Sequence, residues 1–178
     1  DRLVPLARLE SALGYRFADP ALLEQALTHK SHGRPHNERL EFLGDAVLGY
    51  VVADRLYHLR PDEHEDVLSL IRSSLVRRET LAAIARELDL GRFLRLGIGE
   101  RRSGGHRRPS ILADALEAVI GAVHLDGGID AARQLVDRVL ETRMTDASTL
   151  TTRDAKDAKT RLQEHLQAAN LALPEYRI

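Results

Sequence analysis

Three acidic residues, Glu38, Glu41 and Asp45, recur at helical spacing in one short stretch of the chain. At about 100° per residue they fall within an arc of about 60° on one helix face, with Leu40 and Val47 roughly opposite. Like charges at this spacing repel one another, and the repulsion grows when the groups are partly buried. The stripe is therefore suited to a cation, and oxygen ligands of this kind are those that Mg²⁺ prefers.

A second acidic pair, Asp114 and Glu117, lies in another apolar stretch and shares a helix side with Ala118 and Gly121. Small residues allow a second helix to approach closely on that side. The opposite side carries the residues expected to face the core, which are Leu112, Leu116, Val119 and Val123. Spacing alone leaves two alternatives open: either the two acidic faces meet in one cleft as a metal site, or each is a solvated helix face.

The elements that must position these acids are predicted to be helices, because apolar residues recur mainly at helical spacing. The expected helices cover residues 3–13, 20–27, 37–59, 65–88, 111–125 and 129–142. Asp19 is the expected N-cap of the second, the fourth is expected to break near Arg77, and Gly91 is expected to terminate it. The basic, glycine-rich residues 97–109 are predicted to form an exposed flexible loop.

Composition limits the classes of function. The chain has 178 residues, 43% of them hydrophobic, and no cysteine, which excludes disulfides, zinc–thiolate sites and thiol catalysis. The net formal charge of −1 does not by itself indicate a nucleic-acid-binding protein, so such a role depends on how the charge is distributed. The apolar runs are short and the first residues do not resemble a signal peptide, so we expect a cytoplasmic protein without a membrane segment.

The stretch Asn37-Glu-Arg-Leu-Glu-Phe-Leu-Gly-Asp-Ala-Val-Leu48 resembles the signature of bacterial ribonuclease III, the double-stranded-RNA-specific endoribonuclease. The similarity continues in Ala26-Leu-Thr-His-Lys-Ser31, Leu96-Gly-Ile-Gly-Glu100, Ser103-Gly-Gly105 and Ser110-Ile-Leu-Ala-Asp-Ala-Leu-Glu-Ala118. It resumes in Ala158-Lys-Thr-Arg-Leu-Gln-Glu164 and Leu173-Pro-Glu-Tyr-Arg177, which look like the start of a double-stranded-RNA-binding domain.

The resemblance implies an all-α fold, the helical bundle of a ribonuclease III endonuclease domain, followed by an incomplete α+β RNA-binding domain. We expect the nuclease domain at 1–146, a polar linker at 147–155 and the truncated second domain at 156–178. The polar composition that suggests the linker begins at Thr145. The missing initiating Met and the end at Ile178 suggest that the native chain extends beyond both ends.

The resemblance also implies site residues. Its metal ligands fall on Glu41, Asp45, Asp114 and Glu117, of which Asp45 and Glu117 are the expected catalytic acids. Glu38 matches a further acidic position. Glu65 matches another, but the residue after it is Asp66 where the family has glycine, which weakens that match. The implied cofactor is Mg²⁺, with Mn²⁺ as a substitute.

Two further sets of residues follow from the resemblance and from charge. Phe42 resembles an aromatic that enters the partner subunit in family homodimers, although a role in its own core is the alternative. The expected contacts to RNA are Arg101, Arg102, Arg107 and Arg108 in the basic loop, and Gln163 and Glu164 in the second domain.

The implied function is hydrolysis of phosphodiester bonds in double-stranded RNA, leaving 5′-phosphate and 3′-hydroxyl ends, in the processing of ribosomal, messenger and other RNA. Two alternatives remain: a catalytically silent protein that binds duplex RNA on the same fold, and an all-α metal-dependent nucleotide phosphohydrolase. Loss of one of the four acids would favour the first, yet all four are present. Turnover of nucleoside triphosphates would favour the second.

Overall fold

The computed structural model describes residues 6–147, and this part of the chain is helical. Two short helices come first. They are α1, Leu6–Leu13, and α2, Pro20–Ala26, which begins where the sequence predicts it. The Asp19 carboxylate accepts a hydrogen bond from the amide of Ala21 at 3.0 Å, which confirms Asp19 as the N-cap. The predicted linker beyond residue 147 and the predicted second domain at 156–178 lie outside the described residues.

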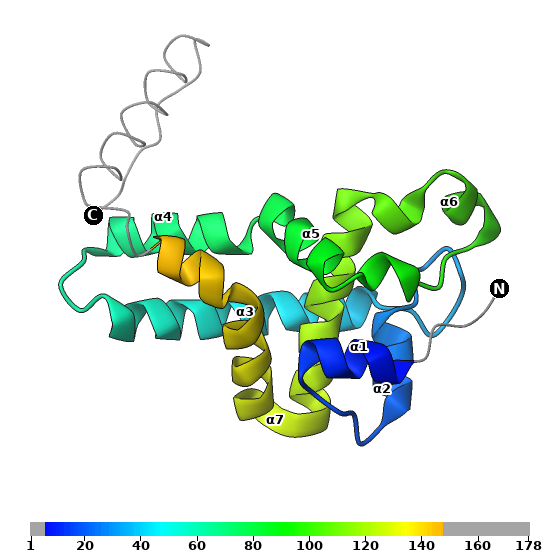
Figure 1. Cartoon of the computed structure of the whole chain (residues 1–178), viewed down its shortest axis with the longest axis horizontal. Coiled ribbons are helices and arrows are strands. Elements are labelled where there is room, and N and C mark those ends of the chain that lie inside the picture. Colours follow the sequence, from blue (N-terminus) through cyan, green and yellow to red (C-terminus); the bar gives the residue numbers. More distant parts are fainter. Residues whose placement is uncertain (1–5, 148–178) are drawn as a thin grey trace, which may run out of the picture.

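The next three helices follow the predicted pattern closely. Helix α3 covers Glu38–Leu59 and ends one residue before the Arg60–Pro61 pair. Helices α4, Glu65–Val76, and α5, Arg78–Glu87, are separated at Arg77, whose backbone is extended (φ −67°, ψ 154°). The predicted break is therefore confirmed. Helix α4 returns alongside α3, so the two form a long antiparallel pair on one side of the molecule (Figure 1).

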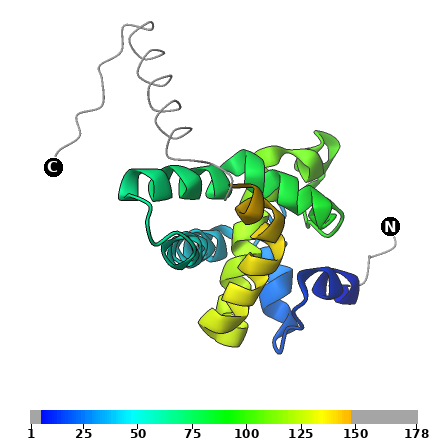
Figure 2. The same cartoon turned by 60° about the vertical axis from the view of Figure 1, so that its left-hand side comes forward.

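Helix α7 is the central element. It runs through Pro109–Ala147 and changes direction at Gly128, whose backbone is not helical (φ 81°, ψ −177°). Its first half packs against α2, α3 and α5, and Figure 2 shows it enclosed by them. The helix continues beyond the predicted end at residue 142 and includes Thr145, where the linker was expected to start. The prediction was wrong there because Leu140 and Met144, both buried, extend the core-facing side of the helix.

The prediction of a flexible loop at residues 97–109 was also wrong. The chain there forms helix α6, Ile98–Arg102, and a 3₁₀ turn η2, Gly105–Arg107. Another 3₁₀ turn, η1, covers Leu90–Arg92, so Gly91 does not terminate α5. A Cβ at Gly91 would lie 2.3 Å from the carbonyl oxygen of His106, which explains the glycine by close packing of η1 on η2.

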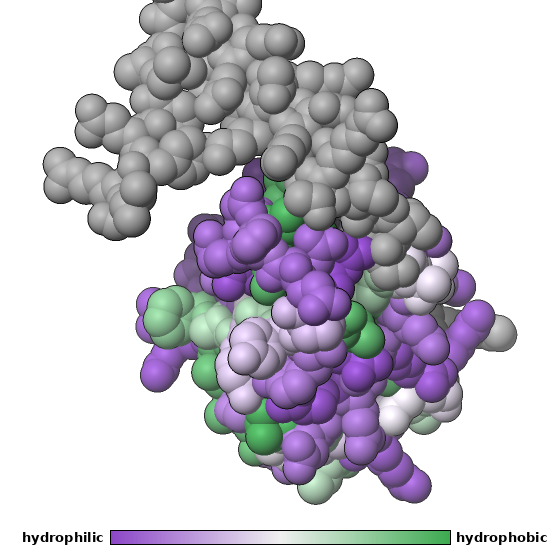
Figure 3. Space-filling model, turned by 90° about the vertical axis from the view of Figure 1, so that its left-hand side faces the viewer, coloured by the Kyte–Doolittle hydropathy of each residue, from purple (hydrophilic) through white to green (hydrophobic). Residues whose placement is uncertain are grey.

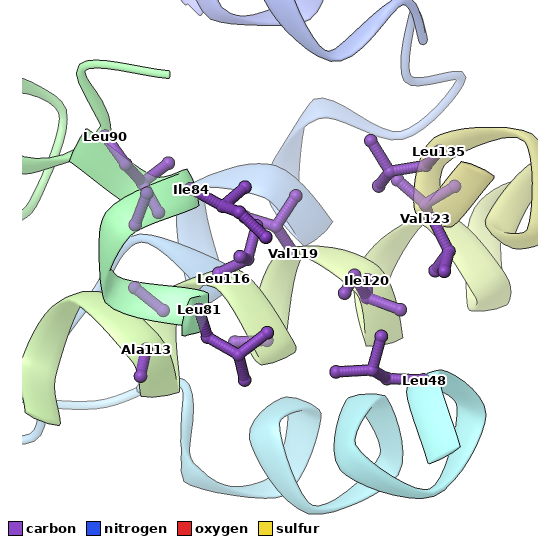
Figure 4. Close-up of a cluster of buried hydrophobic side chains, with 14 of the residues drawn as sticks. Leu48, Leu81, Ile84, Leu90, Ala113, Leu116, Val119, Ile120, Val123 and Leu135 are labelled. Atoms are coloured by element: carbon purple, nitrogen blue, oxygen red, sulfur yellow. The ribbon is translucent and has the colours of Figure 1, made fainter. Parts of the chain in front are cut away.

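The core lies between α7 and the helices around it. Leu116, Val119 and Ile120 of α7 face Leu48 of α3 and Leu81 of α5, and all are at most 2% exposed (Figure 4). The four residues predicted as the core stripe of this helix are all buried. On the face that holds the end of the α3–α4 pair, the visible surface is mostly hydrophilic, with smaller hydrophobic patches (Figure 3). No helix within residues 6–147 is long and apolar enough to cross a membrane.

Candidate active site

The site is built on a close crossing of α3 and α7. A Cβ at Gly44 would lie 1.7 Å from the carbonyl oxygen of Glu117, and a Cβ at Gly121 would lie 2.3 Å from the carbonyl oxygen of Leu40. Real Cβ atoms do not approach so closely, so both positions require glycine. The close approach predicted from Gly121 is confirmed, and Gly44 supplies the matching surface on α3. This contact brings the two acidic helix faces together.

Carboxylates from both helices converge at the crossing. Ligand oxygens of Glu41, Asp114 and Glu117 all lie within 4.8 Å of one another. Asp45, one turn along α3 from Glu41, lines the same cavity, which has a volume of about 400 Å³. The other lining residues are Phe42, Val76, Arg78, Leu81 and Ala113. The structure therefore places the four predicted ligands around one cavity, and we refer to Glu41, Asp45, Asp114 and Glu117 as the carboxylate cluster.

The electrostatics of the carboxylate cluster are unfavourable in the absence of a cation. Burial raises the pKa of Glu117 to about 8, and the negative charges of Asp45, Glu41 and Asp114 contribute. Burial is also the main reason that the pKa values of Glu41 and Asp114 are raised. Partly buried carboxylates that repel one another are stabilised by a bound cation or by a proton. The donor set, four carboxylates and no nitrogen or sulfur, fits a hard divalent ion such as Mg²⁺ or Mn²⁺.

Glu38 lies beside this cluster and has its own partners. Lys30 donates a hydrogen bond from Nζ to a Glu38 carboxylate oxygen at 2.8 Å, and His36 Nδ1 lies 3.8 Å from the other oxygen. The hydrogen bond from Lys30 is the main reason that the pKa of Glu38 is lowered, opposite to the shift of Glu41. Glu38 therefore resembles a surface ion pair more than a member of the cluster.

Glu65 is not brought to the cluster by the fold of this chain. It begins α4, which pairs with the far end of α3. The α3 residues between Glu41 and Leu59 span roughly 27 Å at 1.5 Å per residue. The Glu65 carboxylate instead accepts a hydrogen bond from the Ser69 hydroxyl at 2.6 Å.

Phe42 is unusually exposed for an aromatic residue. Its side chain is 81% accessible, and it forms part of the wall of the carboxylate cavity. A place in the core of its own chain, which was the alternative to a dimer contact, is therefore excluded. An apolar ring in this setting gains stability when another surface covers it.

The basic segment has a more definite structure than the sequence suggests. Arg108 forms an ion pair with Glu100 at 2.7 Å, and a Cβ at Gly105 would lie 2.7 Å from the Glu100 side chain. Arg108 is thus engaged in holding α6 and η2 together. The three other predicted RNA contacts in this segment, Arg101, Arg102 and Arg107, are exposed. The predicted contacts Gln163 and Glu164 lie outside the described residues.

Sequence reasoning missed Arg78, the first residue of α5, which lines the carboxylate cavity. The helix faces that carry the acids contain no cation, but Arg78 reaches the cavity from a third helix. A signal was present in the sequence. Arg77 and Arg78 stand together at the start of a helix, where the helix dipole disfavours positive charge.

Comparison with known proteins agrees with the geometry. The ribonuclease-III-like family model matches residues 19–144. Ribonuclease 3 of Alkalilimnicola ehrlichii is 55% identical over 174 residues, which are 98% of this chain and 75% of the relative. Ribonuclease 3 of Nitrosococcus oceani is 54% identical over 173 residues, 97% of this chain and 74% of the relative.

A solved structure gives the same result for the fold. The nuclease domain of ribonuclease III from Campylobacter jejuni is 46% identical, with a TM-score of 0.76, and the match covers 78% of this chain and 97% of that one. The helices, the site and the sequence relatives therefore agree that this chain belongs to the ribonuclease III family and is a ribonuclease.

Proposed function

We propose that this protein cuts double-stranded RNA at the carboxylate cavity, by hydrolysing phosphodiester bonds so that 5′-phosphate and 3′-hydroxyl ends remain. The observation that carries the proposal is the convergence of Glu41, Asp114 and Glu117 oxygens within 4.8 Å at the α3–α7 crossing. In the cell, this activity would serve the processing of ribosomal and other RNA in the cytoplasm.

The four residues of the carboxylate cluster would hold a divalent ion, Mg²⁺ or its substitute Mn²⁺. Such an ion supplies stabilisation of negative charge on phosphate and a lowered pKa for a bound water. Asp45 and Glu117 are the proposed catalytic acids. The raised pKa of Glu117 supports the assignment, because such a residue is protonated or bound to a cation near neutral pH.

Substrate binding needs positive charge near this acidic cavity. Arg101, Arg102 and Arg107 supply exposed cations on α6 and η2 and are suited to phosphates of the RNA backbone. We assign the start of a second RNA-binding domain to residues 156–178, joined by a linker at 147–155. Gln163 and Glu164 would contact the minor groove of the duplex from that domain.

The active form is proposed to be a homodimer. The 81% exposed Phe42 supports this, because a second subunit would cover the ring. The solved Campylobacter jejuni nuclease domain likewise has a region described as involved in dimer formation. A dimer with twofold symmetry would place two carboxylate cavities on one duplex, each cutting one strand. Sedimentation of the wild type and of Phe42→Ala tests this proposal, and a wild type that is monomeric at micromolar concentration would refute it.

The activity itself is tested by incubating a long RNA duplex with the protein in Mg²⁺ at low salt. Parallel reactions contain EDTA, single-stranded RNA, duplex DNA or nucleoside triphosphates, and Glu117→Gln serves as the site variant. Metal-dependent cutting of duplex RNA, absent in Glu117→Gln, is the expected result. Binding of duplex RNA without cutting, or turnover of nucleotides instead, would refute the proposed function.

A further inference from the structure

Arg78 is the one cation among the described residues that line the carboxylate cavity. Its positive charge acts on the cluster, because it lowers the pKa values of Asp114 and Glu117. For both acids, however, burial has the larger and opposite effect. One arginine therefore does not neutralise the cluster, and its presence there needs a separate explanation.

The guanidinium of Arg78 has no ion-pair partner within residues 6–147. Two other exposed cations do have one. Lys30 binds Glu38 at 2.8 Å, and Arg108 binds Glu100 at 2.7 Å. Arg78 is exposed and borders four carboxylates, yet it forms an ion pair with none of them. Its hydrogen-bond donors thus remain accessible at the mouth of the cavity.

The position of Arg78 in its helix is not explained by helix stability. It is the first residue of α5 and follows Arg77 at the N-cap. The N-terminus of a helix carries partial positive charge, so two arginines there are unfavourable unless an anion lies nearby. Glu79 supplies one anion in this first turn, and the Asp114 and Glu117 carboxylates form no ion pair with Arg78, so its guanidinium can pair with a further anion.

We propose that Arg78 is a substrate-binding residue that pairs with a phosphate of the RNA backbone at the mouth of the carboxylate cavity. This inference rests on the proposed function. A guanidinium has five donors in a planar fork that fits two oxygens of one phosphate, and it has no acceptor, so it does not ligate a metal ion. Arg78 would offset the repulsion between the carboxylate cluster and the phosphates of the incoming strand.

Two roles for Arg78 predict opposite effects on metal binding. If the arginine supports the structure of the cluster, its removal weakens binding of both the metal ion and the RNA. If it binds phosphate, its removal leaves the cavity more negative, so a divalent cation binds as tightly as before or more tightly while RNA binding weakens. The neighbouring Arg77 provides a matched control, because it shares the helix terminus and the charge but does not line the cavity.

The experiment compares wild type, Arg78→Gln, Arg78→Lys and Arg77→Gln in steady-state cleavage of a short RNA duplex in Mg²⁺, over a range of salt concentrations. Arg78→Gln is expected to lower kcat/KM roughly 10- to 100-fold, mainly through KM, as for loss of a charge-assisted hydrogen bond. The slope of log kcat/KM against log salt concentration should become shallower by about 0.9, the value for one lost phosphate contact. Arg78→Lys should keep the wild-type slope and recover part of the loss, whereas Arg77→Gln should change both quantities less.

Calorimetric titration of each free protein with Mn²⁺ provides the second measurement. Equal or tighter Mn²⁺ binding by Arg78→Gln is expected. Weaker Mn²⁺ binding, or a salt slope and KM equal to those of Arg77→Gln, would overturn the inference while leaving the proposed nuclease intact. Failure of the wild type to cut duplex RNA would instead refute the proposed function, and the inference with it.

Discussion

The two ends of the α3–α7 contact differ in how their charged residues are arranged. Towards the end of α3, Asp54 pairs with Arg133 and Arg55 pairs with Asp137 at 3.5 Å, so each acid of one helix meets a base of the other. We call these four residues the ion-pair end. At the other end lies the carboxylate cluster, where acids of α3 face acids of α7 and pKa values are raised.

This difference separates structure from function within one pair of helices. At the ion-pair end, the charged residues of α3 and α7 are paired with one another within the chain. These pairs help hold the second half of α7 on α3. The carboxylate cluster has no ion pairs of this kind between α3 and α7, and the close glycine crossing next to it holds the acids near one another. An arrangement that costs stability in the free protein indicates a site for something the chain does not itself supply.

The largest expected effect comes from Glu117→Gln. It removes a proposed ligand and should lower cutting of duplex RNA by more than about 100-fold, because loss of groups that merely support a ligand already costs 10- to 100-fold. The change also removes a buried carboxyl group whose ionisation is unfavourable in this cluster, so thermal unfolding of the metal-free protein should occur at no lower temperature. A variant that retains wild-type cutting would contradict the site.

The next effect concerns the crossing itself. Gly44→Ala inserts a methyl group where the carbonyl of Glu117 lies, and such overpacking should cost about 3 kcal/mol of unfolding free energy. The matched control is Gly49→Ala on the same helix, where a Cβ meets nothing within 4 Å. The control should be neutral or up to about 1 kcal/mol more stable through helix propensity. Denaturant unfolding measures both, and equal stabilities would refute the requirement for glycine at the crossing.

A smaller effect is expected at the ion-pair end. Asp54→Asn removes the partner of Arg133 and should lower the free energy of unfolding by up to about 1 kcal/mol, as for partly exposed ion pairs. The rate of RNA cutting should stay at the wild-type value. A large loss of activity with an intact fold would show that the two ends do not divide structure from function as described.

The stability of the metal-free protein should also depend on pH. The pKa of Glu117 in the folded chain, about 8, lies above its ordinary value of 4.5. Between these values the folded state binds more protons than the unfolded state, so metal-free stability should fall as pH rises from about 4.5 to about 8. Thermal unfolding at a series of pH values in EDTA measures this. Glu117→Gln should reduce the dependence of the unfolding temperature on pH. If this dependence is the same as in the wild type, groups other than Glu117 cause it.

Several helices were predictable because their signals are local. Asp19 caps α2 through its own side chain, and the buried residues of α7 recur at helical spacing over several turns. The acids could be placed on helix faces for the same reason. The prediction that the two acidic faces meet relied on the resemblance and on Gly121. Helical spacing by itself contains no information on the distance between elements that are far apart in the chain.

The remaining features depend on tertiary contacts that no periodic pattern records. Helix α6 has five residues, too few for a clear apolar period, and it is stabilised by the Arg108–Glu100 ion pair and by the packing of Gly105. Arg78 reaches the cavity from a helix that carries none of the acids. Such positions follow from the packing of three or more elements.

The central claim is that the carboxylate cluster, and not the ion-pair end, binds a divalent ion. The most direct test is thermal unfolding of wild type, Glu117→Gln and Asp54→Asn with and without Mg²⁺ or Mn²⁺. Binding to the folded state raises its stability. The account predicts that metal raises the Tm of the wild type and of Asp54→Asn equally, and has little effect on Glu117→Gln. An equal response of all three proteins, or a response lost in Asp54→Asn alone, would contradict it.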